Sequence, residues 1–94
     1  MAELRFEWDR RKAAGNAKKH KVTFEEARSA FADPNGLVID DPDHSEDEAR
    51  FILLGLSYAL RLLVICHVFR SDAVRIISAR KATPREAASY RGNR

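Results

Sequence analysis

Residues 74–86 read VRIISARKATPRE, an apolar strand that leads directly into the start of a helix. A strand is predicted over Val74–Arg80, where β-branched and apolar side chains dominate. Thr83 can act as N-cap, Pro84 suits the first helical position, and Glu86 can complete a capping box with Thr83. The sequence therefore predicts a rigid strand joined to a capped helix, which fixes where the cationic side chains between them point.

The first third of the chain is predicted to form a strand and two helices. Apolar and polar side chains alternate over residues 4–8, as in a half-buried strand. Asp9 can cap a basic helix that runs to about His20. A second capping box begins at Thr23, and the sequence DPNG at 33–36 ends the amphipathic helix that follows it.

The rest of the chain reads as strands separated by short polar loops, a spacing that favours an antiparallel meander. The predicted strands are Leu37–Ile39, Ala49–Leu56, Arg61–Phe69 and Val74–Arg80. A last helix should run from Pro84 to about Arg91, with Gly92 as its stop. Residues 1–94 are thus predicted to form one α+β domain with the order strand, two helices, antiparallel sheet and C-terminal helix.

The charge of the chain is unevenly distributed. Residues 40–48 contain six acidic side chains and no Lys or Arg, so the remaining residues carry 17 basic side chains against 8 acidic ones, a balance of +9. A surface this basic attracts polyanions, of which nucleic acid is the usual one. The alternative interpretation is a charged surface that is only solvated.

The sequence also indicates a compartment. Cys66 is the chain's one cysteine, which excludes an internal disulfide and fits a reducing environment. The first residues lack the basic and then apolar pattern of a secretory signal, and no apolar run is long enough to cross a bilayer. We therefore expect a cytoplasmic protein without membrane contacts.

Four stretches of the chain together resemble one known family. They read FEWD at 6–9, KHKVTFEEA at 19–27, DPDH at 41–44 and RIISAR at 75–80. Taken together they resemble the BrnT family of ribonuclease toxins over nearly the whole chain. The resemblance implies a toxin of a type II toxin–antitoxin pair, a RelE-like fold, no cofactor, and a small ribbon-helix-helix antitoxin that also binds DNA.

Two positions depart from that family. The family usually has glycine after the Lys-His pair, where this chain has Lys21, and glycine in the hairpin loop, where this chain has Leu60. Neither side chain is a candidate catalytic group. The departures therefore bear on local backbone shape more than on activity.

Strand register predicts which side chains share a face of the sheet. If loops 57–60 and 70–73 close symmetrically, directly opposed residues point to the same face, and an odd-length loop would break this alignment. His67 would then oppose Arg50 on one side and Ile76 on the other. The shared face would carry Arg50, Arg61, His67, Ser78 and Arg80.

The chemistry of metal-free RNA cleavage suggests roles on this face. The same register sets Leu63 opposite Arg80 and leaves Arg61 one diagonal step from Arg80, so both guanidinium groups are candidates to stabilise phosphate charge. His67 is the candidate acid or base, because imidazole titrates near neutral pH. The alternative for His67 is a core histidine in an apolar strand. The alternative for Arg61 and Arg80 is a pair of solvated charges at strand ends.

Further candidates lie on the helices and, for Arg50, at the start of a strand. By analogy with RelE-type enzymes, Tyr90 could stack on a base or assist proton transfer, and core packing of its ring is the alternative. The other candidates are basic side chains that could contact the nucleic-acid backbone, with a solvated face as the alternative. They are Lys12, Lys18, Lys19 and His20 of the basic helix, together with Arg50 and Arg85.

A metal site is not expected. His44 lies among acidic residues, but the segment lacks the glycine and the spacing of a calcium loop, so a solubilising loop or an antitoxin contact is the preferred interpretation. The leading hypothesis is a metal-independent endoribonuclease toxin that cuts messenger RNA and is inhibited by an antitoxin. The rivals are a nucleic-acid-binding module without catalysis and a purely protein-binding half of a complex.

Overall fold

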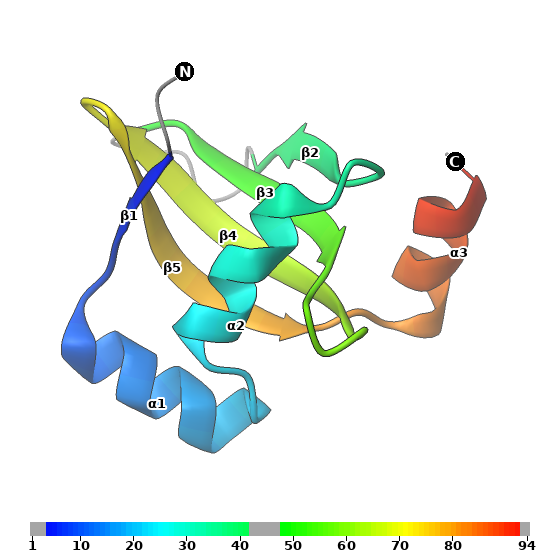
Figure 1. Ribbon diagram of the computed structural model, residues 1–94, viewed down its shortest axis with the longest axis horizontal. Helices are drawn as coiled ribbons and strands as arrows, with labels where there is room; N and C mark the ends of the chain where they lie inside the picture. Colours follow the sequence, from blue (N-terminus) through cyan, green and yellow to red (C-terminus); the bar gives the residue numbers. More distant parts are fainter. Residues whose placement is uncertain (1–3, 42–47, 93–94) are drawn as a thin grey trace.

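The computed structural model describes residues 4–41 and 48–92 (Figure 1). Each predicted strand and helix is present, with bounds that differ from the predicted ones by about one residue. The elements are β1 Arg5–Glu7, α1 Arg10–His20, α2 Phe24–Ser29, the 3₁₀ helix η1 Ala30–Ala32, β2 Leu37–Asp40, β3 Arg50–Leu56, β4 Leu62–Arg70, β5 Ala73–Lys81 and α3 Pro84–Gly92. No helix in this described part is long and apolar enough to span a bilayer.

The strands form one five-stranded sheet in the order β1-β5-β4-β3-β2. Strands β2 to β5 are the predicted antiparallel meander. The sheet as a whole is mixed, because β1 pairs with β5 in parallel, with Phe6 opposite Val74. Local patterning identified β1 as a strand but carries no information on the edge that it joins.

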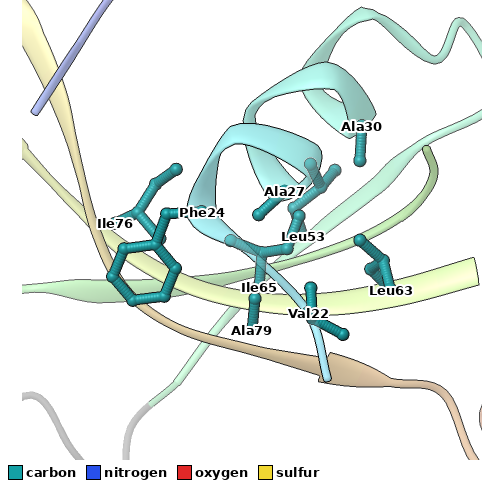
Figure 2. Close-up of a cluster of buried hydrophobic side chains, with 9 residues drawn as sticks. All are labelled: Val22, Phe24, Ala27, Ala30, Leu53, Leu63, Ile65, Ile76 and Ala79. Atoms are coloured by element: carbon teal, nitrogen blue, oxygen red, sulfur yellow. The ribbon is translucent and has the colours of Figure 1, made fainter. Parts of the chain in front are cut away.

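Helices α1 and α2 pack against one face of the sheet, which we call the covered face (Figure 1). Figure 2 shows the core between α2 and the strands, where apolar side chains from both layers meet. This cluster comprises Val22, Phe24, Ala27, Ala30, Leu53, Leu63, Ile65, Ile76 and Ala79. The opposite face, which we call the open face, carries Arg50, Ile52, Val64, Cys66, Ser78 and Arg80.

The predicted N-caps position the helices. Asp9 accepts a hydrogen bond from the Lys12 N–H at 3.0 Å, and Thr23 accepts one from the Glu26 N–H at 3.0 Å. The box at α3 is reciprocal, since the Glu86 N–H bonds Thr83 Oγ1 at 3.2 Å while the Thr83 N–H bonds Glu86 Oε1 at 2.8 Å.

A buried amide holds α1 against β5. Asn16 Nδ2 donates to the carbonyl oxygen of Ala79 at 2.8 Å and to that of Val22 at 2.9 Å, and Asn16 Oδ1 accepts from the Ala79 N–H at 3.0 Å. Local sequence patterns do not predict this link, because the partners are 63 residues apart. One side chain thus fixes the basic helix on the covered face.

The two departures from the family pattern coincide with unusual backbone. Lys21 and Leu60 both have a φ of 60°, in the left-handed region that favours glycine. Lys21 closes α1, where its N–H bonds the Ala17 carbonyl at 3.0 Å, and Leu60 closes the β3–β4 hairpin, where its N–H bonds the Ser57 carbonyl at 2.9 Å. Each L side chain there costs about 1 kcal/mol or more.

The register of the first hairpin differs from the prediction. Leu56 pairs with Leu62, so the loop has an odd number of residues and β3 slips by one position relative to β4. His67 therefore opposes Phe51, whereas Arg50 opposes Val68. The prediction that Arg50 and His67 share a face is wrong.

The second hairpin follows the prediction only near its loop. His67 pairs with Ile76 as predicted, but Cys66 pairs with Ser78, which leaves Ile77 as an extra residue in β5. This bulge shifts the rest of the ladder by one position. Val64, and not Leu63, consequently opposes Arg80.

Candidate functional site

A pocket on the open face brings together two of the predicted arginines. Arg50 from β3 and Arg80 from β5 line it, with the Ser78 hydroxyl and the Cys66 thiol between them, in a volume of about 240 Å³. The remaining lining residues are Asp41, Ile52, Val64 and Ile77. Two guanidinium groups beside a hydroxyl suit an anion such as phosphate, because each offers a planar fork of donors. We call this the open-face pocket.

Arg80 is held in place by Glu86 of α3. Arg80 Nη1 and Nη2 donate to Glu86 Oε1 and Oε2, each at 2.9 Å. These bonds, together with the Thr83 N–H, lower the pKa of Glu86 to about 2, so Glu86 stays ionised at neutral pH. An incoming phosphate at Arg80 therefore has to share the guanidinium with Glu86 or displace the carboxylate.

The pocket thiol is a poor nucleophile. Burial, together with the neighbouring Asp41 carboxylate, raises the pKa of the Cys66 thiol. Cys66 Sγ lies 3.9 Å from Asp41 Oδ2. Since the thiolate is the reactive form, Cys66 stays protonated at neutral pH and acts here as a polarizable wall of the pocket.

Arg61 does not lie on the open face. It belongs to the β3–β4 loop, where Nε donates to Glu26 Oε2 at 2.9 Å and Nη2 bonds both Glu26 Oε1 and the Lys21 carbonyl, the latter at 2.9 Å. Ser57 Oγ donates to the same Glu26 carboxylate at 2.7 Å. This network lowers the pKa of Glu26 through the Arg61 hydrogen bonds and ties the hairpin to α2.

The partner of Arg61 escaped sequence reasoning because Glu26 had a local explanation. The capping-box pattern predicts that the Glu26 side chain turns back to the Thr23 N–H. In the structure Thr23 caps the Glu26 N–H, but the Glu26 carboxylate reaches across 35 residues to Arg61 instead. The capping-box pattern at Thr23 was the available sequence signal for Glu26, and it did not identify Arg61 as the partner of the Glu26 carboxylate.

His67 is a core histidine. It is 0% exposed and its ring lies 4.9 Å from that of Phe31, 5.5 Å from Phe69 and 6.1 Å from Phe51, measured between centroids. Nδ1 lies 3.1 Å from the Ile65 carbonyl oxygen, and Nε2 has no hydrogen-bond partner among the described residues. Burial lowers the pKa of His67. The predicted acid or base is thus on the covered face, away from the open-face pocket.

Tyr90 anchors α3 to the body of the protein. Its hydroxyl donates to Asp33 Oδ2 at 2.6 Å, and its ring is buried. The same carboxylate oxygen accepts from the Leu56 N–H of β3 at 2.8 Å. Tyr90 is not part of the open-face pocket lining, and its packing follows the alternative interpretation.

The basic residues of α1 form a separate surface. Lys12, Lys18 and Lys19 are exposed and His20 is partly exposed, as both interpretations required. Helix α1 packs on the covered face (Figure 1), so these residues belong to an element on the opposite side of the sheet from the open-face pocket. Arg85, also exposed, follows the first residue of α3.

Metal ligands do not gather in residues 4–41 or 48–92. No group of three or more His, Cys, Asp or Glu side chains there could hold a metal ion. His44 and the acidic residues at 43, 46 and 47 lie outside the described residues.

Comparison with known proteins places the chain in a family. The model of the family described as "Ribonuclease toxin, BrnT, of type II toxin-antitoxin system" matches residues 8–86. The fold is similar to the crystal structure of the Brucella abortus ribonuclease toxin BrnT, with a TM-score of 0.68 and 20% identity over 86% of this chain and 99% of that chain. No curated protein sequence matches. Because the family model spans most of its length, the chain belongs to the BrnT family of ribonuclease toxins of type II toxin–antitoxin systems.

Proposed function

We propose that this protein is an endoribonuclease toxin that cuts messenger RNA in the cytoplasm without a metal ion, through a fold related to RelE-type ribonucleases. The observation that carries the proposal is the open-face pocket, where Arg50 and Arg80 flank Ser78 in a member of a ribonuclease-toxin family. A cognate antitoxin of the ribbon-helix-helix type would keep the toxin inactive.

The pocket supplies the electrostatic part of RNA cleavage. Attack of a ribose 2′-hydroxyl on the adjacent phosphate builds negative charge on a pentacovalent phosphorus. The bond from phosphorus to the 5′-oxygen of the next nucleotide then breaks, which leaves a 2′,3′-cyclic phosphate and a 5′-hydroxyl that takes its proton from the solvent. Arg50 and Arg80 stabilise this charge, and the Ser78 hydroxyl can donate to a phosphate oxygen. Donors that are already in place when charge develops are the largest catalytic contribution in many enzymes.

We propose that proton transfer uses a group other than His67 and Arg61. His67 and Arg61 point away from the pocket, so neither reaches a phosphate bound there. The carboxylate in the pocket lining is Asp41, which we propose as the acceptor that orients or removes the 2′-hydroxyl proton. Binding of phosphate at Arg80 replaces the Glu86 carboxylate, so substrate binding and release of Glu86 are coupled.

The basic helix extends the contact with RNA. Lys12, Lys18, Lys19 and His20 offer cationic groups on α1, and Arg85 offers another beside the pocket strand. They would contact the backbone of RNA segments beyond the cleaved bond. Such contacts release counterions, so affinity should fall steeply with rising salt.

The decisive experiment is incubation of purified protein with RNA in EDTA. We expect cleavage that stops when the antitoxin is added. A non-catalytic nucleic-acid-binding module would bind the same RNA and leave it intact. Cleavage that requires added divalent metal would contradict the metal-independent mechanism.

A further inference from the structure

An apolar groove lies beside the open-face pocket. It has a volume of about 300 Å³ and is bordered by α3 on one side and by β2 to β4 on the other. Its lining residues are Leu37, Ile39, Ile52, Leu54, Val64, Glu86 and Ser89. Ile52 and Val64 also line the open-face pocket, so the groove and the pocket form one continuous trough across the open face.

The outer wall of the groove is the edge strand β2. β2 is the last strand of the sheet, and its Val38 and Ile39 are 56% and 60% exposed. Edge strands normally carry lysine, proline or a bulge that discourages pairing with another chain. β2 has the sequence LVID, which contains none of the protective residues at its centre. Exposed apolar side chains on such an edge mark an interaction surface.

The chemistry of the groove favours a polypeptide over RNA. RNA bases stack on aromatic rings or on arginine planes, whereas the groove lining is aliphatic apart from Glu86 and Ser89. The Glu86 carboxylate also repels a phosphate backbone. Aliphatic side chains of another protein, in contrast, bury apolar surface there without such repulsion.

We propose that the trough is the docking site of the antitoxin, which inserts aliphatic side chains into the apolar groove and carboxylates into the open-face pocket. The proposal rests on the proposed toxin function and adds the place and the chemistry of the inhibitor. Charge complementarity selects this occupant, because the pocket end of the trough carries Arg50 and Arg80. The inhibitor thereby occupies the position of the substrate phosphate.

The test compares two neighbouring residues of β2 that face opposite sides of the sheet. Ile39 lines the groove, whereas Val38 is similarly exposed and points to the other face. We expect Ile39→Asn to weaken binding of the purified cognate antitoxin at least tenfold, and Val38→Asn to change it less than threefold. Both variants should cut RNA as the unmodified toxin does, since neither residue lines the open-face pocket.

A second variant covers the case in which Ile39→Asn unfolds. Ser89 is exposed on α3 across the groove, so Ser89→Gln narrows the groove without touching the core. Ser89→Gln should likewise weaken binding of the antitoxin and leave the thermal midpoint of the toxin unchanged. Unaltered antitoxin binding by Ile39→Asn and Ser89→Gln would overturn the proposal.

Two other occupants give different results. If Ile39→Asn impairs RNA cleavage but not inhibition by the antitoxin, the groove binds RNA. If Ile39→Asn only dissociates a toxin dimer seen in sedimentation, the groove binds a second copy of the toxin. Either result refutes antitoxin docking. A toxin that binds antitoxin but never cuts RNA would defeat the proposed function alone, because the binding comparison of Ile39→Asn with Val38→Asn still stands.

Discussion

Arg80 and Glu86 face each other through two parallel hydrogen bonds of 2.9 Å, one for each carboxylate oxygen. The pair joins the end of β5 to the first turn of α3, and it borders both the open-face pocket and the apolar groove. Glu86 therefore positions Arg80 and at the same time competes with phosphate for it. The first two predictions follow from these opposed effects.

Arg80→Lys should reduce single-turnover RNA cleavage by roughly a hundredfold, because lysine keeps the charge but loses the fork of donors. Arg70 is the matched control, since it also forms a two-bond pair with a glutamate, Glu48, and is similarly exposed at 49% against 41%. Arg70→Lys should cut RNA normally. Near-normal cleavage by Arg80→Lys would exclude Arg80 as the phosphate clamp.

Glu86→Gln should tighten RNA binding several-fold, because the amide no longer competes as an anion for Arg80. The dependence of log affinity on log salt should steepen by about one phosphate contact. Glu48→Gln makes the same change of net charge beside Arg70 and controls for general attraction. Equal effects of the two substitutions would mean that Arg80 does not exchange Glu86 for phosphate.

The same substitution has a signature in acid. The folded-state pKa of Glu86 is about 2 against an ordinary value of 4.5, so its pair with Arg80 contributes its full stability above about pH 4.5 and loses it as the pH falls through 2. The contribution should be at most about 1 kcal/mol, because both side chains are partly solvated. The difference in urea stability between wild type and Glu86→Gln should thus be clear at pH 6 and much smaller at pH 2.

Arg61→Ala should lower the free energy of unfolding by about 2 to 4 kcal/mol, because it leaves the buried Glu26 carboxylate without its main partner. RNA cleavage per folded molecule should stay normal. Arg5→Ala, which removes a well-exposed pair with Asp72, should have a negligible effect on stability. Loss of cleavage by Arg61→Ala at unchanged stability would instead mean that Arg61 is a catalytic residue.

Sequence reasoning succeeded where the signals are local. Capping residues such as Asp9 and Thr83 act within four residues, so helix starts could be identified without the fold. It failed where a single residue decides register, since the odd loop and the bulge at Ile77 each move a strand by one position. The odd loop and the bulge each shift a strand by one position relative to β4, the first β3 and the second β5. Arg50 and Arg80 therefore remain on one face, as predicted, while His67 turns to the other.

Lys21→Gly and Leu60→Gly should each stabilise the protein by about 0.5 to 1 kcal/mol, because both residues have a φ of 60° that glycine adopts without a Cβ clash. Lys18→Gly is the control, since Lys18 lies inside α1 and glycine should destabilise the helix there by about 1 kcal/mol. Opposite signs for two Lys→Gly changes three residues apart would confirm the backbone argument. Destabilisation at position 21 would contradict it.

His67 should make the protein sensitive to mild acid. Burial among Phe31, Phe51 and Phe69 lowers its pKa, and no charged group belongs to this ring cluster. The unfolded chain, with an ordinary histidine pKa near 6.5, then binds a proton more readily than the folded one. Stability should therefore fall as the pH drops below about 6.5, and should level off below the lowered pKa of the folded state.

The size of that loss measures how strongly the ring cluster disfavours imidazolium, at about 1.4 kcal/mol for each unit by which the pKa is lowered. Urea unfolding of wild type and His67→Phe between pH 7.5 and 4.5 isolates it, because phenylalanine does not titrate. The curve of His67→Phe should be flatter over this range. If His67→Phe loses stability with falling pH as steeply as wild type does, the acid sensitivity arises from other residues. The three phenylalanine rings would then not disfavour the protonated form of His67.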